Sequence, residues 1–96
     1  MSPPSLSHAA HQWLSEAGKA LSQGRADLAE QPLKRVLAEA PGFAGAQLMY
    51  GIACQMRGEN ETAVEYMRKA AQQRPDDPNI LTTLGGALYD SGATEE

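Results

Sequence analysis

An internal repeat with a period of 34 residues constrains this chain more than any other feature. When the sequence is shifted by this interval, residues of similar size or class coincide. The coinciding positions are Trp13, Gln47 and Leu81; Ala17, Gly51 and Gly85; Ala20, Cys54 and Leu88; Gly24, Gly58 and Gly92; Ala29 and Ala63; Leu33 and Met67; Val36 and Ala70; Leu37 and Ala71; and Pro41 and Pro75. A period of this length is typical of helical repeat arrays, in which each unit buries its apolar face against its neighbours.

Each period contains stretches in which apolar residues recur at steps of three and four, the spacing of one helical face. These stretches predict helices over residues 8–22, 27–39, 47–57, 61–74 and 78 to about 90. Gly24 and Gly58 each follow the first helix of a unit, where a residue with positive φ ends the helix. Pro41 and Pro75 follow the second helix, because the residue before a proline disfavours helical geometry.

Two helix starts are predicted to carry capping residues. Asn60 is expected as the N-cap of the fourth helix, and Asp77 as the N-cap of the fifth, with Pro78 at its first helical position. Pro32 falls inside the second helix, where it removes a backbone donor. We expect a bend there rather than a break, because the apolar pattern continues after it.

This pattern resembles the tetratricopeptide repeat family. The matching residues are Trp13, Ala17, Ala29, Leu33 and Pro41 in the first unit, Gly51, Ala63, Met67, Ala70 and Pro75 in the second, and Leu81, Leu84, Gly85 and Leu88 in the third. The sequence departs from the family pattern at Glu16, Ala20, Val36 and Gln47. The resemblance implies an all-α solenoid of tandem helix-turn-helix repeats, about two and a half units with five helices. Residues 1–7 would form an N-terminal extension, 8–43 the first unit, 44–77 the second, and 78–96 the first helix of a third unit, truncated or capping.

The composition argues against several classes of function. The formal net charge is −4, whereas a nucleic-acid or anionic-membrane surface needs a dense field of lysine and arginine. No apolar run approaches the roughly 20 residues of a membrane span. Cys54 is the single cysteine, which rules out an internal disulfide framework. Residues 1–7 lack the basic and apolar segments of a signal peptide, so the predicted location is the cytoplasm.

The residues that could carry chemistry have simpler interpretations. His8 and His11 are expected at a solvated helix end, because no third ligand stands at metal-binding spacing. Cys54 is expected as a buried structural thiol, because no histidine or cationic cluster would lower its pKa. No phosphate-binding loop is present. The chain is therefore predicted not to be an enzyme and to need no cofactor or metal.

The family resemblance implies a concave face lined by the first helix of each unit. The positions that it implies are His11, Leu14, Gly18, Leu21, Gly45, Leu48, Ile52, Gln55, Asn79, Thr82, Gly86 and Tyr89. From these we take Leu14, Gly18, Leu21, Leu48, Ile52, Gln55, Thr82 and Tyr89 as the candidate peptide-binding groove. The set is largely apolar or small, which favours an apolar or amphipathic segment of a protein partner. The alternative is that Leu14, Leu48 and Ile52 pack against neighbouring helices.

The predicted function is a non-enzymatic protein–protein interaction module. The alternative is an N-terminal accessory domain of a larger enzyme, for example a bacterial sulfotransferase or glycosyltransferase, and a weaker one is a self-assembling scaffold. A subclass of the family binds chaperone tails through lysine and asparagine at positions that are Leu14 and Gly18 here, which argues against that mode. The last helix is apolar around more than one face, so we also expect a homo-oligomer through it.

Overall fold

The computed structural model describes residues 6–91, and this part of the chain contains five α-helices and no strand. The helices are α1 (His8–Ser22), α2 (Ala26–Glu39), α3 (Ala44–Met56), α4 (Asn60–Gln73) and α5 (Pro78–Ser91). The predicted all-α class is therefore confirmed. The first five residues of the predicted extension, Gly92 and the end of the predicted third unit lie outside the described residues.

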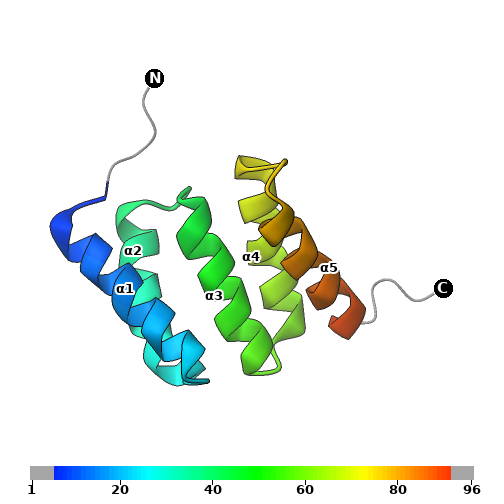
Figure 1. The fold of residues 1–96 in the computed structure, drawn as a ribbon, viewed down its shortest axis with the longest axis horizontal. Coiled ribbons are helices and arrows are strands. Elements are labelled where there is room, and N and C mark those ends of the chain that lie inside the picture. The colour runs from blue at the N-terminus through cyan, green and yellow to red at the C-terminus, as the bar shows by residue number, and fades with distance from the viewer. Residues whose placement is uncertain (1–5, 92–96) are drawn as a thin grey trace.

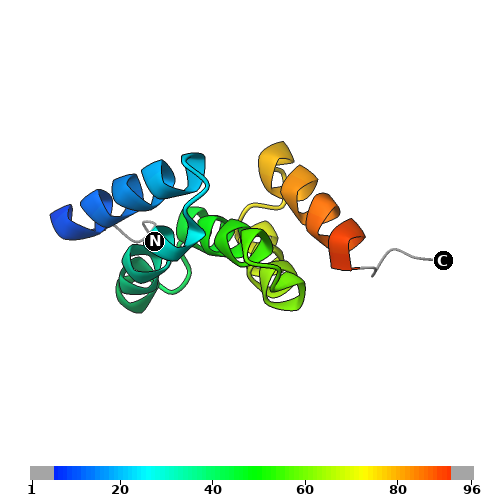
Figure 2. The same cartoon turned by 90° about the horizontal axis from the view of Figure 1, so that it is seen from below.

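The helices form an array in which each one packs against the next (Figure 1). The central helix α3 also contacts α1 and α5, whereas α1 and α5 do not contact each other. Seen from below, α1 and α5 stand on one side of α3, and α2 and α4 lie on the other (Figure 2). The array therefore has one side built from the first helix of each unit and another built from the second helices.

The two loops inside the repeat units have the same geometry, 34 residues apart. Gly24 has φ of 73° and Gly58 has φ of 83°, in the left-handed region that glycine adopts without steric cost. The next residue closes both turns, because Arg25 N donates to Ala20 O and Glu59 N donates to Cys54 O, each at 2.8 Å. The predicted role of both glycines as helix terminators is confirmed.

Helix starts were predicted less well. The predicted N-cap Asn60 is wrong, because Glu59 occupies the cap and Asn60 is the first helical residue of α4. Glu59 makes no side-chain capping bond, so the repeated loop geometry, not a cap, sets this start. Helix α3 begins at Ala44, three residues before the predicted Gln47. The Asp77 cap is confirmed, since Asn79 N donates to Asp77 Oδ1 at 2.9 Å.

The buried core is made from small residues at helix crossings and large ones between them. Leu33, Val36 and Met67 are the largest fully buried side chains. The closest approach is at Gly51, where a Cβ would lie 2.8 Å from Met67 Cγ. Trp13 and Tyr50 are partly buried and pack against the core. Helix α2 runs without interruption through Pro32.

Gln47 is the most visible departure from the repeat pattern. Its side chain is buried, although its counterparts in the other units are apolar. The Nε2 atom donates to Pro41 O at 2.8 Å, which ties the start of α3 to the α2–α3 loop. Its Oε1 atom is buried without a hydrogen-bond partner. Gln47 therefore fixes the loop between the two units rather than filling core volume alone.

Candidate interaction surface

The candidate surface is the side of the array formed by α1, α3 and α5, which we call the α1–α3–α5 face. Helix α3 lies at its centre, flanked by α1 and α5 (Figure 2). The flanking helices each contact α3 but not each other, and Leu48 and Ile52 of α3 are only partly buried. This is the side on which the sequence placed all eight candidate residues.

On α1, the three candidates lie at the boundary with α3. Leu14 and Leu21 are partly buried and pack against the core cluster that contains Ala17. A Cβ on Gly18 would lie 3.3 Å from Met49 Cε, so this glycine lets Met49 of α3 approach α1 closely. Gly18 therefore positions α1 against α3.

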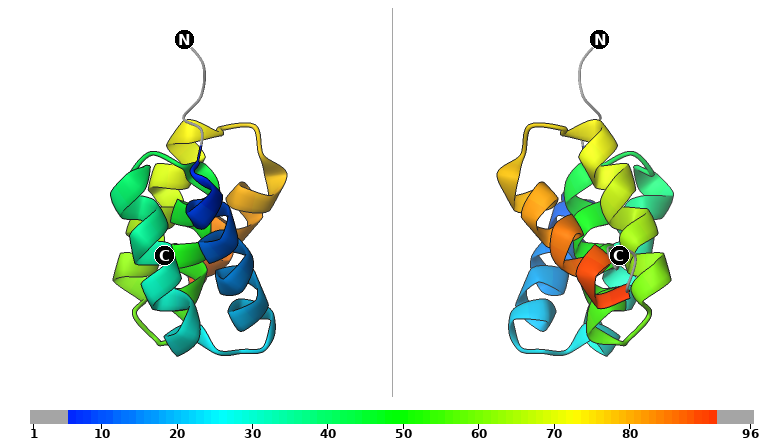
Figure 3. Two further views of the ribbon diagram at one scale, coloured as in Figure 1. Left: turned by 90° about the vertical axis from the view of Figure 1, so that its left-hand side faces the viewer. Right: turned by 90° about the vertical axis from the view of Figure 1, so that its right-hand side faces the viewer.

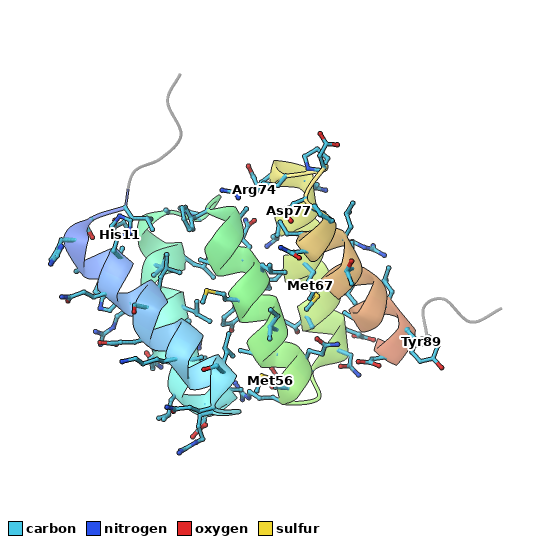
Figure 4. The ribbon with its side chains drawn as sticks, in the orientation of Figure 1. His11, Met56, Met67, Arg74, Asp77 and Tyr89 are labelled. Carbon is cyan, nitrogen blue, oxygen red and sulfur yellow. The ribbon has the colours of Figure 1, made fainter. Side chains whose placement is uncertain are left out.

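On α3, the candidates divide between packing and exposure. Leu48 packs against the clusters that contain Ile80 and Ala87, and so joins α3 to α5. Ile52 is partly buried against the cluster around Met67. Met56, four residues after Ile52, keeps 44% of its surface exposed. Residues at this spacing share one helix face, so Ile52 and Met56 form an apolar stripe on α3. Met56 lies at the C-terminal end of this helix (Figure 4).

Gln55 and Asp90 connect α3 to α5 near the C-terminal ends of both helices. Gln55 Nε2 donates to Asp90 Oδ2 at 2.8 Å. The structure therefore brings one predicted residue, Gln55, together with one that the sequence analysis missed. Asp90 could have been found only from the three-dimensional pairing of the two helix ends, because 35 residues separate it from Gln55.

The two candidates on α5 are more exposed than the others. Thr82 is exposed, and Tyr89 keeps 77% of its surface accessible. Figure 4 shows Tyr89 at the end of α5, pointing away from the rest of the molecule. The structure thus gathers Leu14, Leu21, Leu48 and Ile52 around α3 and leaves Tyr89 at the periphery.

Met49 is a further residue that the sequence analysis did not select. It is partly buried against the first core cluster and fills the space left by Gly18. The signal that could have found it is the glycine opposite, since a small residue on one helix accommodates a large one on its neighbour. With Met56, it gives this surface flexible thioether side chains that adapt to apolar partners.

Apart from Asp90, the charged groups with defined partners belong to α2, α4 and the loops next to them. Glu30 of α2 forms an ion pair with Arg57, and a second at 3.1 Å with Lys34. The hydrogen bond from Lys34 and the nearby charge of Arg57 lower the pKa of the Glu30 carboxyl. Between α3 and α4, the Tyr50 and Tyr66 rings meet edge to face at 4.7 Å, and burial raises the pKa of Tyr50. None of the eight candidate residues is charged.

The groups that could carry chemistry are embedded or dispersed. Cys54 is buried, and this burial is the main reason why the pKa of its thiol is raised, as expected for a structural cysteine. Within residues 6–91, no three metal-binding side chains converge. None of the helices in that range is long and apolar enough to cross a membrane.

Part of the chain matches a known protein family. Residues 44–87, from the start of α3 to the last third of α5, match the family described as tetratricopeptide repeat. No curated protein matches the chain. The matched segment contains α3, α4 and most of α5.

Proposed function

We propose that this chain, whose residues 44–87 match the tetratricopeptide repeat family, binds a protein partner on the α1–α3–α5 face, because the repeats of that family are in general non-catalytic protein-interaction modules. The proposal includes the absence of enzymatic activity. The alternative of an accessory domain in a larger enzyme stays a prediction.

The observation that carries the proposal is the apolar stripe on α3. Ile52 is partly exposed and Met56, the last residue of α3, is 44% exposed, on a helix whose two flanking helices do not contact each other. Leu14 and Leu21 of α1 border the stripe on one side. An exposed apolar strip with a polar rim is the usual character of a protein interaction site.

The chemistry of the face selects the kind of partner segment. The uncharged stripe favours apolar side chains, spaced along one side of a helix or alternating along an extended chain. Gln55 and Asp90 lie at one end of the stripe and supply the polar group that fixes orientation. The partner is therefore an amphipathic segment with apolar anchors and a donor near one end.

Peptide selection followed by mapping tests this proposal. Peptides selected from a random display library on the wild-type protein are titrated into isotopically labelled protein, and the shifted amides are mapped by NMR. We expect the shifts to concentrate on α1, α3 and α5. Shifts confined to α2 and α4 would contradict the assignment of the face.

A pair of matched variants sharpens the test. Ile52→Glu places a charge in the stripe, and we expect it to weaken peptide binding at least about tenfold. Leu28→Glu makes the same kind of change on α2, where Leu28 is 53% exposed, and binding should remain unchanged. Circular dichroism of both variants shows whether the helices are retained. Equal affinity for all three folded proteins would remove the proposal.

A further inference from the structure

A second surface lies at the end of the array farthest from α1, where α4 and α5 stand side by side (Figure 3, right). We call it the end face. Its residues on α4 are Glu61, Val64, Glu65, Arg68, Lys69 and Gln72, which line one pocket, and its residues on α5 are Leu81, Gly85 and Leu88. This surface is separate from the α1–α3–α5 face, because Leu81 and Gly85 lie on a different stripe of α5 from Thr82 and Tyr89.

The α5 part of the end face repeats a stripe that is covered elsewhere in the molecule. Its counterparts on α3, 34 residues earlier, are Gln47, Gly51 and Cys54, and all three are buried. Helix α4 covers Gly51, where a Cβ would meet Met67 at 2.8 Å. On α5, Leu81 is 47% exposed and a Cβ on Gly85 would meet nothing within 4 Å. The stripe that receives a helix on α3 is therefore open on α5 within the described residues.

The α4 part of the end face carries an ordered charge pattern. Its long side chains border an open pocket of about 410 Å³, lined by Glu61, Val64, Glu65, Arg68, Lys69 and Gln72. The acidic residues, Glu61 and Glu65, occupy the first half of this stripe. The basic residues, Arg68 and Lys69, occupy the second half. A stripe of this kind is complementary to itself when two copies run antiparallel.

The packing of α4 on α5 brings the charge pattern of α4 level with the stripe of Leu81, Gly85 and Leu88 on α5. Val64 packs in the same cluster as Leu84 and Ala87. Ala71, about two turns further along α4, packs with Ile80. The point midway between Glu65 and Arg68 is therefore level with the point midway between Leu81 and Leu88. A single two-fold axis at that level can therefore relate α4 to the α4 of a second copy and α5 to its α5.

We propose that the end face binds a second copy of this chain about such an axis, with α4 antiparallel to α4 and α5 antiparallel to α5. Glu65 then faces Arg68 of the second copy, and the same pair recurs by symmetry. Leu81 faces Leu88 of the second copy, and Gly85 lets the two α5 helices approach closely. The contact covers the exposed Leu81 and the partly buried Leu88, and it pairs the opposite charges in one arrangement.

Sedimentation velocity of the full chain over a wide concentration series tests the proposal. We expect a reversible dimer whose dissociation constant rises at least about tenfold in Leu81→Glu and in Gly85→Lys. The Gly85→Lys variant keeps the test valid if Leu81→Glu fails to fold, because replacing an exposed helical glycine favours the helix. Leu28→Glu on α2 is the control and should dimerise like wild type.

Charge exchange tests the orientation of the two copies. Glu65→Arg and Arg68→Glu should each weaken the dimer, because each places like charges opposite one another. The double variant restores both pairs across the axis, and its dissociation constant should return toward that of wild type. A wild-type protein that stays monomeric throughout, a dimer insensitive to Leu81→Glu and Gly85→Lys, or a double variant as weak as the singles would overturn the proposal.

Discussion

Glycine has two opposite roles in these helices, and substitution separates them. A Cβ on Gly51 would lie 2.8 Å from Met67 Cγ and 3.1 Å from the Ala63 carbonyl oxygen. Gly51→Ala should therefore lower the free energy of unfolding by about 1–3 kcal/mol through overpacking. Gly86 in α5 has open space around it, so Gly86→Ala should raise that free energy by about 0.5–1 kcal/mol. Urea unfolding followed by circular dichroism measures both, and equal signs for the two variants would contradict this account.

Glu39 links the end of α2 to the start of α1 through a titratable contact. Its carboxylate accepts hydrogen bonds from Ser7 N at 2.7 Å and from Ser7 Oγ at 2.8 Å, and these bonds lower the pKa of Glu39 below its usual 4.5. A lowered folded-state pKa stabilises the fold above the unfolded-state pKa, and this stabilisation is lost as the pH falls through the folded-state value.

Replacing that carboxylate tests the linkage. Glu39→Gln should be less stable than wild type at neutral pH, and the difference should vanish as the pH falls below the folded-state pKa of Glu39. Urea unfolding of both proteins over a pH series measures the difference. A gap that persists unchanged in acid would show that the charge of Glu39 is not its source.

At the scale of the helix, Pro32 is the residue that the fold tolerates at a cost. It lies in the interior of α2, where it can donate no hydrogen bond to the preceding turn. Pro32→Ala should restore that bond and raise the free energy of unfolding by roughly 1–3 kcal/mol. Gln31→Ala, at the exposed neighbouring position, should change it little. Thermal unfolding by circular dichroism compares the two, and a loss of stability in Pro32→Ala would mean that the proline fits a required bend.

The five helices of residues 6–91 could be predicted from the sequence because the apolar spacing, the glycines and the prolines that define them act within a few residues. Gly24, Gly58 and Asp77 terminate or cap helices through bonds within a few residues of themselves. The start of α3 could not be placed in this way, because it depends on Gln47 reaching back to the Pro41 carbonyl. The Asn60 assignment failed because a repeated turn can start a helix without a capping side chain.

The candidate site was predictable as a face but not as a set of contacts. Helical spacing indicates which residues share a stripe, and so groups Leu48 with Ile52. It does not show that Gly18 accommodates Met49, or that Gln55 meets Asp90, because those pairs depend on how neighbouring helices cross. Which of the eight residues touch a partner stays a prediction for the peptide experiment.

At the scale of the whole molecule, an array of this kind does not depend on a single core that unfolds in one step. Helix α3 packs against each of the other four helices described here, whereas α5 packs only against α4 and α3. Stability in such arrays is a sum of unit and nearest-neighbour terms, so it varies along the chain. The two interior glycines of α5, Gly85 and Gly86, lower its helix stability further.

Amide hydrogen exchange measures this gradient directly. At low protein concentration, the amides of α3 should be the most protected, and those of α5 should be protected about tenfold less or weaker still. If the end face binds a second copy, raising the protein concentration should slow exchange in α5 and α4 while α1 and α2 change little, because only the covered helices gain neighbours. Uniform protection across all five helices would instead mean that the units unfold together, and the array would then behave as one cooperative domain.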